Sequence, residues 1–420
     1  MVYLYNPTEI FNAFCDLEGV DLFDESKSYT KSDIIVCPIK WELWSIEALM
    51  IENYHEALKN KDFEHVCQGF RTKKIDKLIE NYGAKILLYQ EWECRDLMLH
   101  QSKLEKFVTE HLKMPIGSVY FSTCDYLRHM KPLFGNVISF DWVYVREKAN
   151  FREDNIIAHH PKQTKRIITL NYRGSQERFA YCYYLHTLHR DKITFSYLDA
   201  PLHDLGDLAD ILGSSYEQKE FDVFKKQIPR LLDGTNPDQH QTHTIHDYLS
   251  DAAINVAFET NLESINSFAE QVSEKAYKGL RIGKPFMIFT TKGRILQHLR
   301  SLGFKTFSPL INEEYDNPKL SYEVRYRLLL DESSRICNMS EEEFQSLNAR
   351  LQSIVQYNLD VLENGSTPNI FEWMSKPYRR KSWLSVVLKY RYAFRFIWND
   401  RWSFAQSKAK IRKIVRPALG

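Results

Sequence analysis

A short charged sequence, Ser273-Glu274-Lys275, begins a helix-like run after the strand-like segment 256–260 and an intervening loop. A helix N-terminus presents free N–H groups and positive potential to an anion, and the Lys275 ammonium suits a phosphate. The Glu274 carboxylate can accept two hydrogen bonds from a ribose diol. These residue types predict a nucleotide-diphosphate site, although such charge pairs are also common on solvated helix faces.

A second basic turn joins the strand-like run 166–170 to the helix-like run 175–188. It contains Gly174, with Arg173 before it and Arg178 on the helix. A strand-to-helix turn with glycine and two arginines is well placed to contact a pyrophosphate. An ordinary polar turn with Arg173 in solvent is the alternative.

The segment 256–316 resembles two-domain glycosyltransferases of the GT-B type, in particular the fucosyltransferase family and related glycosyltransferases of tailed phages. In those families a strand ends in Phe-Glu, a helix starts with Thr/Ser-Glu-Lys, and a Gly-x-Pro-Phe/Val strand follows. The phage members continue with Leu-Arg-x-Leu-Gly-Phe-Lys-Thr-Phe and an acidic Glu-x-Tyr-Asp. The corresponding residues here are 258–259, 273–275, 283–286, 299–307 and 313–316.

The resemblance implies a nucleotide-diphosphate sugar as the donor substrate. It also implies an Asn-x-Arg turn, so the donor-binding residues would be Asn171, Arg173, Arg178, Glu259, Ser273, Glu274 and Lys275. The loop before Ser273 departs from the Asn-Ser form usual in fucosyltransferases, so the donor sugar stays open among hexoses, fucose and pentoses. No Asp-x-Asp element stands where metal-dependent glycosyltransferases carry one. We therefore expect a metal-independent enzyme in which Lys and Arg stabilise the departing diphosphate.

Inverting transfer to a hydroxyl needs a base that takes the acceptor proton. In the fucosyltransferase family a Glu follows a strand comparable to 85–89, which makes Glu91 the first candidate and Glu93 the second. Asp125 and Asp141 also stand near strand ends. The alternative for each of these acids is an exposed position in a loop, with no part in catalysis.

The chain around these residues alternates strand-like and helix-like runs, which predicts parallel α/β layers. The fold class expected is α/β, with two Rossmann-like domains facing a central cleft (GT-B type). The domains would be an acceptor-side domain at 1–160, a nucleotide-sugar domain at 161–375 and a C-terminal segment at 376–420. The expected strands are 32–39, 85–89, 118–122, 136–145, 166–170, 192–198, 252–258, 285–290 and 305–307. The expected helices are 41–59, 102–113, 175–188, 274–280, 293–302 and 340–363, the last with a capping box of Ser340 and Glu343.

The C-terminal segment 376–420 differs from the rest in charge. It holds thirteen Lys and Arg against one acid, Asp400, whereas the rest holds 43 basic and 54 acidic residues. It is also rich in aromatic side chains. Such asymmetry predicts a polyanionic partner, either nucleic acid or an anionic membrane surface. Helical packing of Tyr390, Phe394 and Trp398 onto the first domain is a third interpretation.

Composition excludes several classes of protein. A hydrophobic fraction of 44% excludes a wholly disordered chain. No run approaches the roughly 18 apolar residues of a membrane-spanning helix, and the first residues do not read as a signal peptide. The seven cysteines include no Cys-x-x-Cys pair, which argues against a disulfide framework or a cysteine zinc site and favours the cytoplasm. His240, His243 and His246 lie in a polar stretch, where separate roles are favoured over a metal site.

These observations predict a nucleotide-sugar-dependent glycosyltransferase that acts on a hydroxyl. The favoured acceptor is a hydroxylated base in phage DNA, with the basic segment bound to phosphates. A surface glycan or a lipid-linked saccharide at a membrane is the alternative acceptor. A non-enzymatic nucleic-acid-binding module is the alternative from another class.

Overall fold

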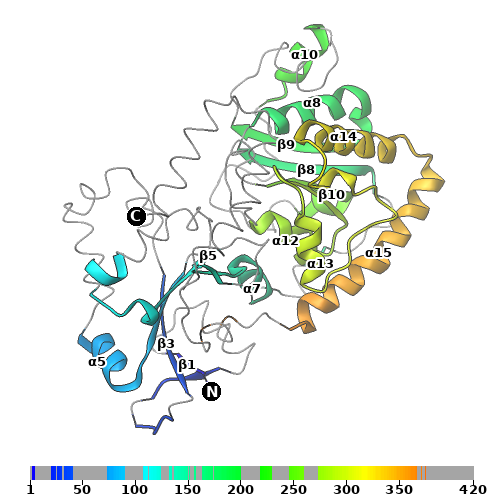
Figure 1. Cartoon of the computed structure of the whole chain (residues 1–420). Helices are drawn as coiled ribbons and strands as arrows, with labels where there is room; N and C mark the ends of the chain where they lie inside the picture. The colour runs from blue at the N-terminus through cyan, green and yellow to red at the C-terminus, as the bar shows by residue number, and fades with distance from the viewer. Residues whose placement is uncertain are drawn as a thin grey trace. The chain divides into compact units, whose positions relative to one another are not determined.

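The computed structural model divides into two compact units, which are described separately (Figure 1). The first comprises Met1–Ala149, Ser267–Gln271 and Ser366–Gly420, and the second Asn150–Asn266 and Val272–Gly365. The structure describes residues 2–4, 20–24, 26–30, 33–40, 73–89, 107–111, 113–123, 132–134, 137–149, 151, 156–157, 163–173, 175–199, 218–228, 246–259, 273–366, 370 and 374.

The first unit is built on a seven-stranded sheet in the order β2-β1-β3-β4-β5-β7-β6. Neighbouring strands are parallel, except that β6 runs antiparallel to β7. Strand β4 lies in the middle and buries four consecutive residues, as expected of a strand covered on both faces. The strands are β1 (Val2–Leu4), β2 (Asp21–Leu22), β3 (Ile34–Lys40), β4 (Lys85–Tyr89), β5 (Val119–Thr123), β6 (Pro132–Phe134) and β7 (Val137–Ser139).

The helical elements of this unit include α5 (Lys73–Tyr82), a π-helix (Phe107–His111), a 3₁₀ turn (Ile116–Ser118) and α7 (Trp142–Ala149). The predicted strand 136–145 is wrong in its second half, because β7 ends at Ser139 and α7 follows. The buried Asp141 carboxylate accepts a hydrogen bond from the Tyr144 backbone N–H at 2.8 Å and thereby caps α7. Asp141, one of the acids considered as a catalytic base, is therefore engaged at a helix start.

Residues beyond the second unit contribute to the interior of the first. The side chains of Ile370 and Met374 are fully buried. Lys85, the first residue of β4, donates hydrogen bonds to the Met374 carbonyl and, at 3.4 Å, to the Tyr120 hydroxyl. The chain thus rejoins the first sheet just before the basic segment 376–420, which itself lies outside the described residues.

The second unit is built on a four-stranded parallel sheet in the order β11-β10-β8-β9. All seven residues of β10 are buried, as the continuous apolar run predicts. The strands are β8 (Lys165–Arg173), β9 (Ile193–Asp199), β10 (Ala252–Phe258) and β11 (Phe286–Phe289). The helices are α8 (Gln176–His189), α10 (Gln218–Lys225), α11 (His246–Asp251), α12 (Glu274–Arg281), α13 (Ile295–Ser301), α14 (Tyr322–Asn338) and α15 (Glu341–Asn364).

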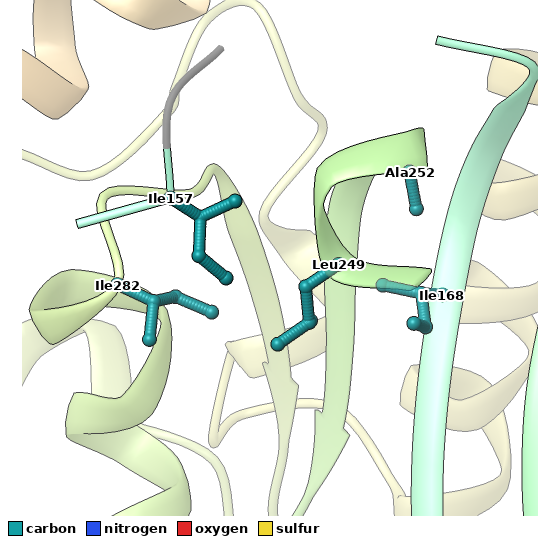
Figure 2. Packing of buried hydrophobic residues seen from close by; sticks show 5 residues of the cluster. All are labelled: Ile157, Ile168, Leu249, Ala252 and Ile282. Atoms are coloured by element: carbon teal, nitrogen blue, oxygen red, sulfur yellow. The ribbon is translucent and has the colours of Figure 1, made fainter. Parts of the chain in front are cut away.

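Apolar side chains from three parts of this unit meet beside β8 (Figure 2). Ile168 of β8 packs in one cluster with Leu249, Ala252, Ile282 and Ile157. The Ile157 backbone N–H donates to the Ile282 carbonyl at 2.9 Å, which fastens the entering chain to the end of α12. The cluster therefore fixes α12 against the sheet. The parallel strands and the helices of both units confirm the predicted α/β fold class.

Two predictions about the end of this unit have opposite outcomes. The capping box of Ser340 and Glu343 is present and opens α15, which ends one residue after the expected position. The predicted strand at 305–307 is wrong, because the Glu313 side chain holds these residues in a loop. The Glu313 carboxylate accepts hydrogen bonds from the backbone N–H groups of Phe307 and Ser308.

A buried lysine at the start of β11 makes stability depend on pH. The Lys284 ammonium donates to the Ala252 carbonyl at 3.2 Å, and burial lowers the pKa of Lys284 to about 8. Between pH 8 and the unfolded value near 10.5 the unfolded chain binds more protons, so the free energy of unfolding rises as pH rises. Below pH 8 the cost of the buried charge is fully present.

We predict that Lys284→Met stabilises the protein at pH 7 by on the order of 1–3 kcal/mol. The Ala252 carbonyl keeps a donor, since Gln163 Nε2 also lies 3.2 Å from it. Urea unfolding at pH 7 and pH 10 should show the gain shrinking at the higher pH. The exposed Lys319→Met should change neither value, and an equal gain at both pH values would contradict the assignment.

Candidate nucleotide site at the carboxyl edge of the second sheet

The two central strands of the second sheet part near their carboxyl ends. Pairing between β8 and β10 ends at Thr169 and Val256. Strand β8 continues beside β9 as far as Arg173, and β10 continues beside β11 as far as Phe258. The chain passes from β8 to β9 on one side and returns to β10 on the other, so this is the topological switch point at which open α/β sheets bind ligands.

Glu259 follows β10 at this point and is almost completely buried. Its backbone N–H donates to the Phe289 carbonyl at 3.0 Å, which extends the pairing with β11. Its Oε1 accepts from the Ser273 backbone N–H at 3.1 Å. Burial raises the pKa of Glu259, while the Lys275 charge and the Ser273 hydrogen bonds oppose that rise. The carboxylate therefore joins the end of β10 to the start of α12.

Helix α12 begins at this carboxylate. Ser273 is its N-cap, and the serine Oγ accepts from the Lys275 backbone N–H at 3.3 Å. Lys275 Nζ lies 2.8 Å from Glu274 Oε1, and these side chains are 31% and 43% exposed. An ion pair this exposed is weak and can exchange its partner for a ligand, whereas Glu259 is already engaged in the interior.

Gly279 lets α12 approach the sheet closely. A Cβ at this position would lie 2.8 Å from the Phe286 ring of β11. The glycine therefore allows the second turn of α12 to pack closely on the first residue of β11.

Arg178 reaches the end of β10 from α8. Its Nη2 donates to the carbonyls of Phe258, at 3.1 Å, and Glu259, at 2.9 Å, and the side chain is 7% exposed. Burial lowers the pKa of Arg178 and the Glu259 charge raises it. The guanidinium stays charged throughout the range in which proteins fold. It therefore places a fixed positive charge beside the switch point.

Asn171 and Arg173 lie on β8, and the structure gives them different surroundings. The Asn171 amide is buried, and its Nδ2 donates to Thr169 Oγ1 at 3.2 Å and to Cys182 Sγ of α8 at 3.5 Å. It thus stabilises the packing of α8 on the sheet. The backbone of Arg173 pairs with Asp199 of β9 at the end of the strand. The side chain of Arg173 lies outside the described residues, and donor binding by either residue stays a prediction.

The predicted catalytic acids Glu91 and Glu93 lie outside the described residues. Strand β4 ends at Tyr89, so both acids come directly after the carboxyl end of a central strand of the first sheet. Asp125 also lies outside the described residues, two positions after the end of β5.

A second buried arginine, which the sequence did not single out, holds the end of β11. Arg325 of α14 donates to the carbonyls of Thr290, at 3.0 Å, and Thr291. Asp316 accepts from the Leu296 backbone N–H at 2.9 Å and so caps α13 from a distance. The sequence feature that could have revealed this residue is a single Arg in the first helical turn after Ser321. An arginine thus lies at the carboxyl end of each of two neighbouring strands.

Comparison with known proteins assigns the chain to no family. No protein-family model matches the chain, and a search of curated proteins finds no match. Among the described residues, no three His, Cys, Asp or Glu side chains gather into a group that could hold a metal ion. No helix within those same ranges is long and apolar enough to cross a membrane.

We predict that Lys275→Ala weakens nucleoside-diphosphate binding by roughly 10- to 100-fold, as expected for the loss of a charge-assisted hydrogen bond. Lys278→Ala, one turn later on the same helix, is the matched control and should leave affinity unchanged. Calorimetric titration with UDP and with GDP measures both. Equal affinities for the wild type and Lys275→Ala would remove Lys275 from the site.

Proposed function

We propose that this chain is a nucleotide-sugar-dependent glycosyltransferase that moves a sugar to a hydroxyl acceptor. One observation carries the proposal. Arg178, Glu259, Ser273 and Lys275 come from separate parts of the sequence and gather where β8 and β10 part. A helix N-terminus and a partly exposed ammonium suit the diphosphate of such a donor, and a buried guanidinium holds the strand end beside them. The resemblance of 256–316 to GT-B enzymes supports the same class.

In this proposal the diphosphate lies at the start of α12. Lys275 contacts the phosphates and Glu274 accepts hydrogen bonds from the ribose diol. Lys and Arg side chains stabilise the charge that develops on the leaving diphosphate, so no divalent cation is required. The first unit supplies the acceptor side and the base, in the two-domain GT-B arrangement, and the product has inverted configuration.

The acceptor we favour is a hydroxylated base in DNA, as in phage enzymes that modify their genomes. The basic segment 376–420 would contact phosphates, and its aromatic side chains would stack on a displaced base. Such an enzyme works in the cytoplasm, that of the infected host if a phage encodes it. A glycan or lipid-linked saccharide at an anionic membrane is the second candidate, because the same segment suits that surface.

The proposal is tested with a panel of nucleotide-sugars incubated with the full chain, with and without hydroxymethylated DNA. We expect donor consumption, and sugar bound to DNA for the matching donor. Transfer to a lipid-linked acceptor alone would replace DNA as the acceptor. Nucleic-acid binding with no donor turnover in any mixture would favour a non-enzymatic module.

Glu91→Gln should lower turnover by ~10²–10⁴, because the amide keeps the shape of the side chain but cannot take the acceptor proton. Donor affinity should stay the same, since Glu91 belongs to the other unit. Glu93→Gln is the matched control. If Glu93→Gln loses turnover while Glu91→Gln keeps it, the base is Glu93.

Removal of the residues after Ser375 should abolish polyanion binding and leave donor binding intact. If six of the basic residues neutralise DNA phosphates, log K should fall with log salt at a slope of about −5. Gel shift with duplex DNA and flotation with anionic liposomes, each over a salt series, measure this. Binding of neither partner by the full chain at ~50 mM salt would refute the polyanion assignment.

A further inference from the structure

We propose that Arg178 is a positioning residue of the candidate site, which acts through Glu259 and the start of α12 and does not contact the ligand. This inference rests on the proposed nucleotide site. It changes the role expected from the sequence, in which Arg178 contacts the pyrophosphate itself.

The carbonyls at the end of β10 take hydrogen bonds from Arg178. Ladder pairing with β8 stops at Val256, so that strand supplies no donor to the Phe258 carbonyl, and the Glu259 carbonyl follows the end of β10. Arg178 Nη2 supplies hydrogen bonds to both, at 3.1 and 2.9 Å. One guanidinium thus replaces the missing part of the ladder and fixes the end of β10 to α8.

Glu259 transmits the position of the strand end to the start of α12. Its carbonyl is held by Arg178, its N–H by Phe289 of β11 and its carboxylate by the N–H of Ser273. Ser273 in turn caps α12 through the Lys275 backbone N–H. A shift in the backbone of Glu259 would therefore move the helix start that carries Lys275.

Arg178 and Lys275 differ in how accessible they are to a ligand. Arg178 is 7% exposed and its Nη2 is engaged by two carbonyls, whereas the Lys275 side chain is 31% exposed. Moving the guanidinium onto a phosphate would leave two buried carbonyls without this donor, which costs roughly 1–3 kcal/mol each. The roles are therefore divided: Lys275 reaches the ligand and Arg178 holds the strand end.

Arg166 provides a matched control at the opposite end of β8. It is 3% exposed and donates to the carbonyls of Ile336, Cys337 and Met339 at the end of α14. Arg166→Met removes another buried arginine that binds backbone carbonyls in the same unit, from β8 and not from α8, and far in sequence from Glu259 and Ser273.

The first arm of the test uses the ligand-free full chain and measures amide hydrogen exchange. Arg178→Met should speed exchange at residues 273–276 by at least about tenfold, because α12 loses its anchored start. Arg166→Met should not speed exchange at residues 273–276 more than it does elsewhere in the chain. Arg178→Lys, which keeps the charge but not the fork, is the second variant if Arg178→Met fails to fold, and it should give a smaller increase. Unchanged exchange at 273–276, or an equal rise in Arg166→Met, would overturn the proposal.

The second arm is a double-mutant cycle on affinity for UDP and for GDP. If Arg178 positions Lys275, then Lys275→Ala should cost much less affinity in the Arg178→Met background than in the wild type. Additive losses, within about twofold, would mean that Arg178 contacts the ligand and would overturn the proposal. If the wild type binds neither nucleotide, the proposed function fails and the exchange arm alone decides the role of Arg178.

Discussion

The carboxyl end of β10 is held by hydrogen bonds from outside its own ladder with β8, and the candidate site depends on them. Once β8 and β10 part, ladder pairing with β8 no longer reaches the end of β10, where the buried carbonyls of Phe258 and Glu259 lie. The guanidinium of Arg178 binds both, and Glu259, which carries the second carbonyl, accepts with its carboxylate from the N–H of Ser273, the N-cap of α12. Such buried polar networks are stable only when their members are satisfied, which ties α8, β10 and α12 into one arrangement.

The same device recurs on β11. Arg325 binds the carbonyls that follow this strand, and Asp316 caps α13. The segment 299–316 has a related structural role. Arg300 and Thr306 both donate to Glu313, whose carboxylate also binds the backbone of the loop after α13. These residues shape the loop that follows α13.

Much of the second sheet could be predicted from the sequence, because strands such as β10 and β11 are apolar runs and four of its helices begin at serine caps. The strand 252–258 and the capping box at Ser340 are examples. Helix α14 was missed because it buries polar side chains, including Arg325, Glu332 and Ser333, which break the apolar period. Residues 142–145 looked like a strand because aromatic and β-branched types favour strands, yet the Asp141 cap and burial on all sides make them a helix.

The candidate site could be predicted only in part. Helix-start chemistry pointed to Ser273, Glu274 and Lys275. The contact of Arg178 with Glu259 joins residues 81 positions apart, which no local pattern reveals. Spacing also cannot distinguish an arginine that contacts a phosphate from one that holds a strand, because that depends on where the ladder ends.

The most direct test of the account is a crystal structure of the full chain with the nucleoside diphosphate that it binds best. We expect the diphosphate at the start of α12, beside the ends of β8 and β10, with Lys275 in contact and Arg178 still bound to its two carbonyls. A diphosphate bound at the carboxyl edge of the first sheet, where β1 and β3 form the corresponding switch point, would contradict it.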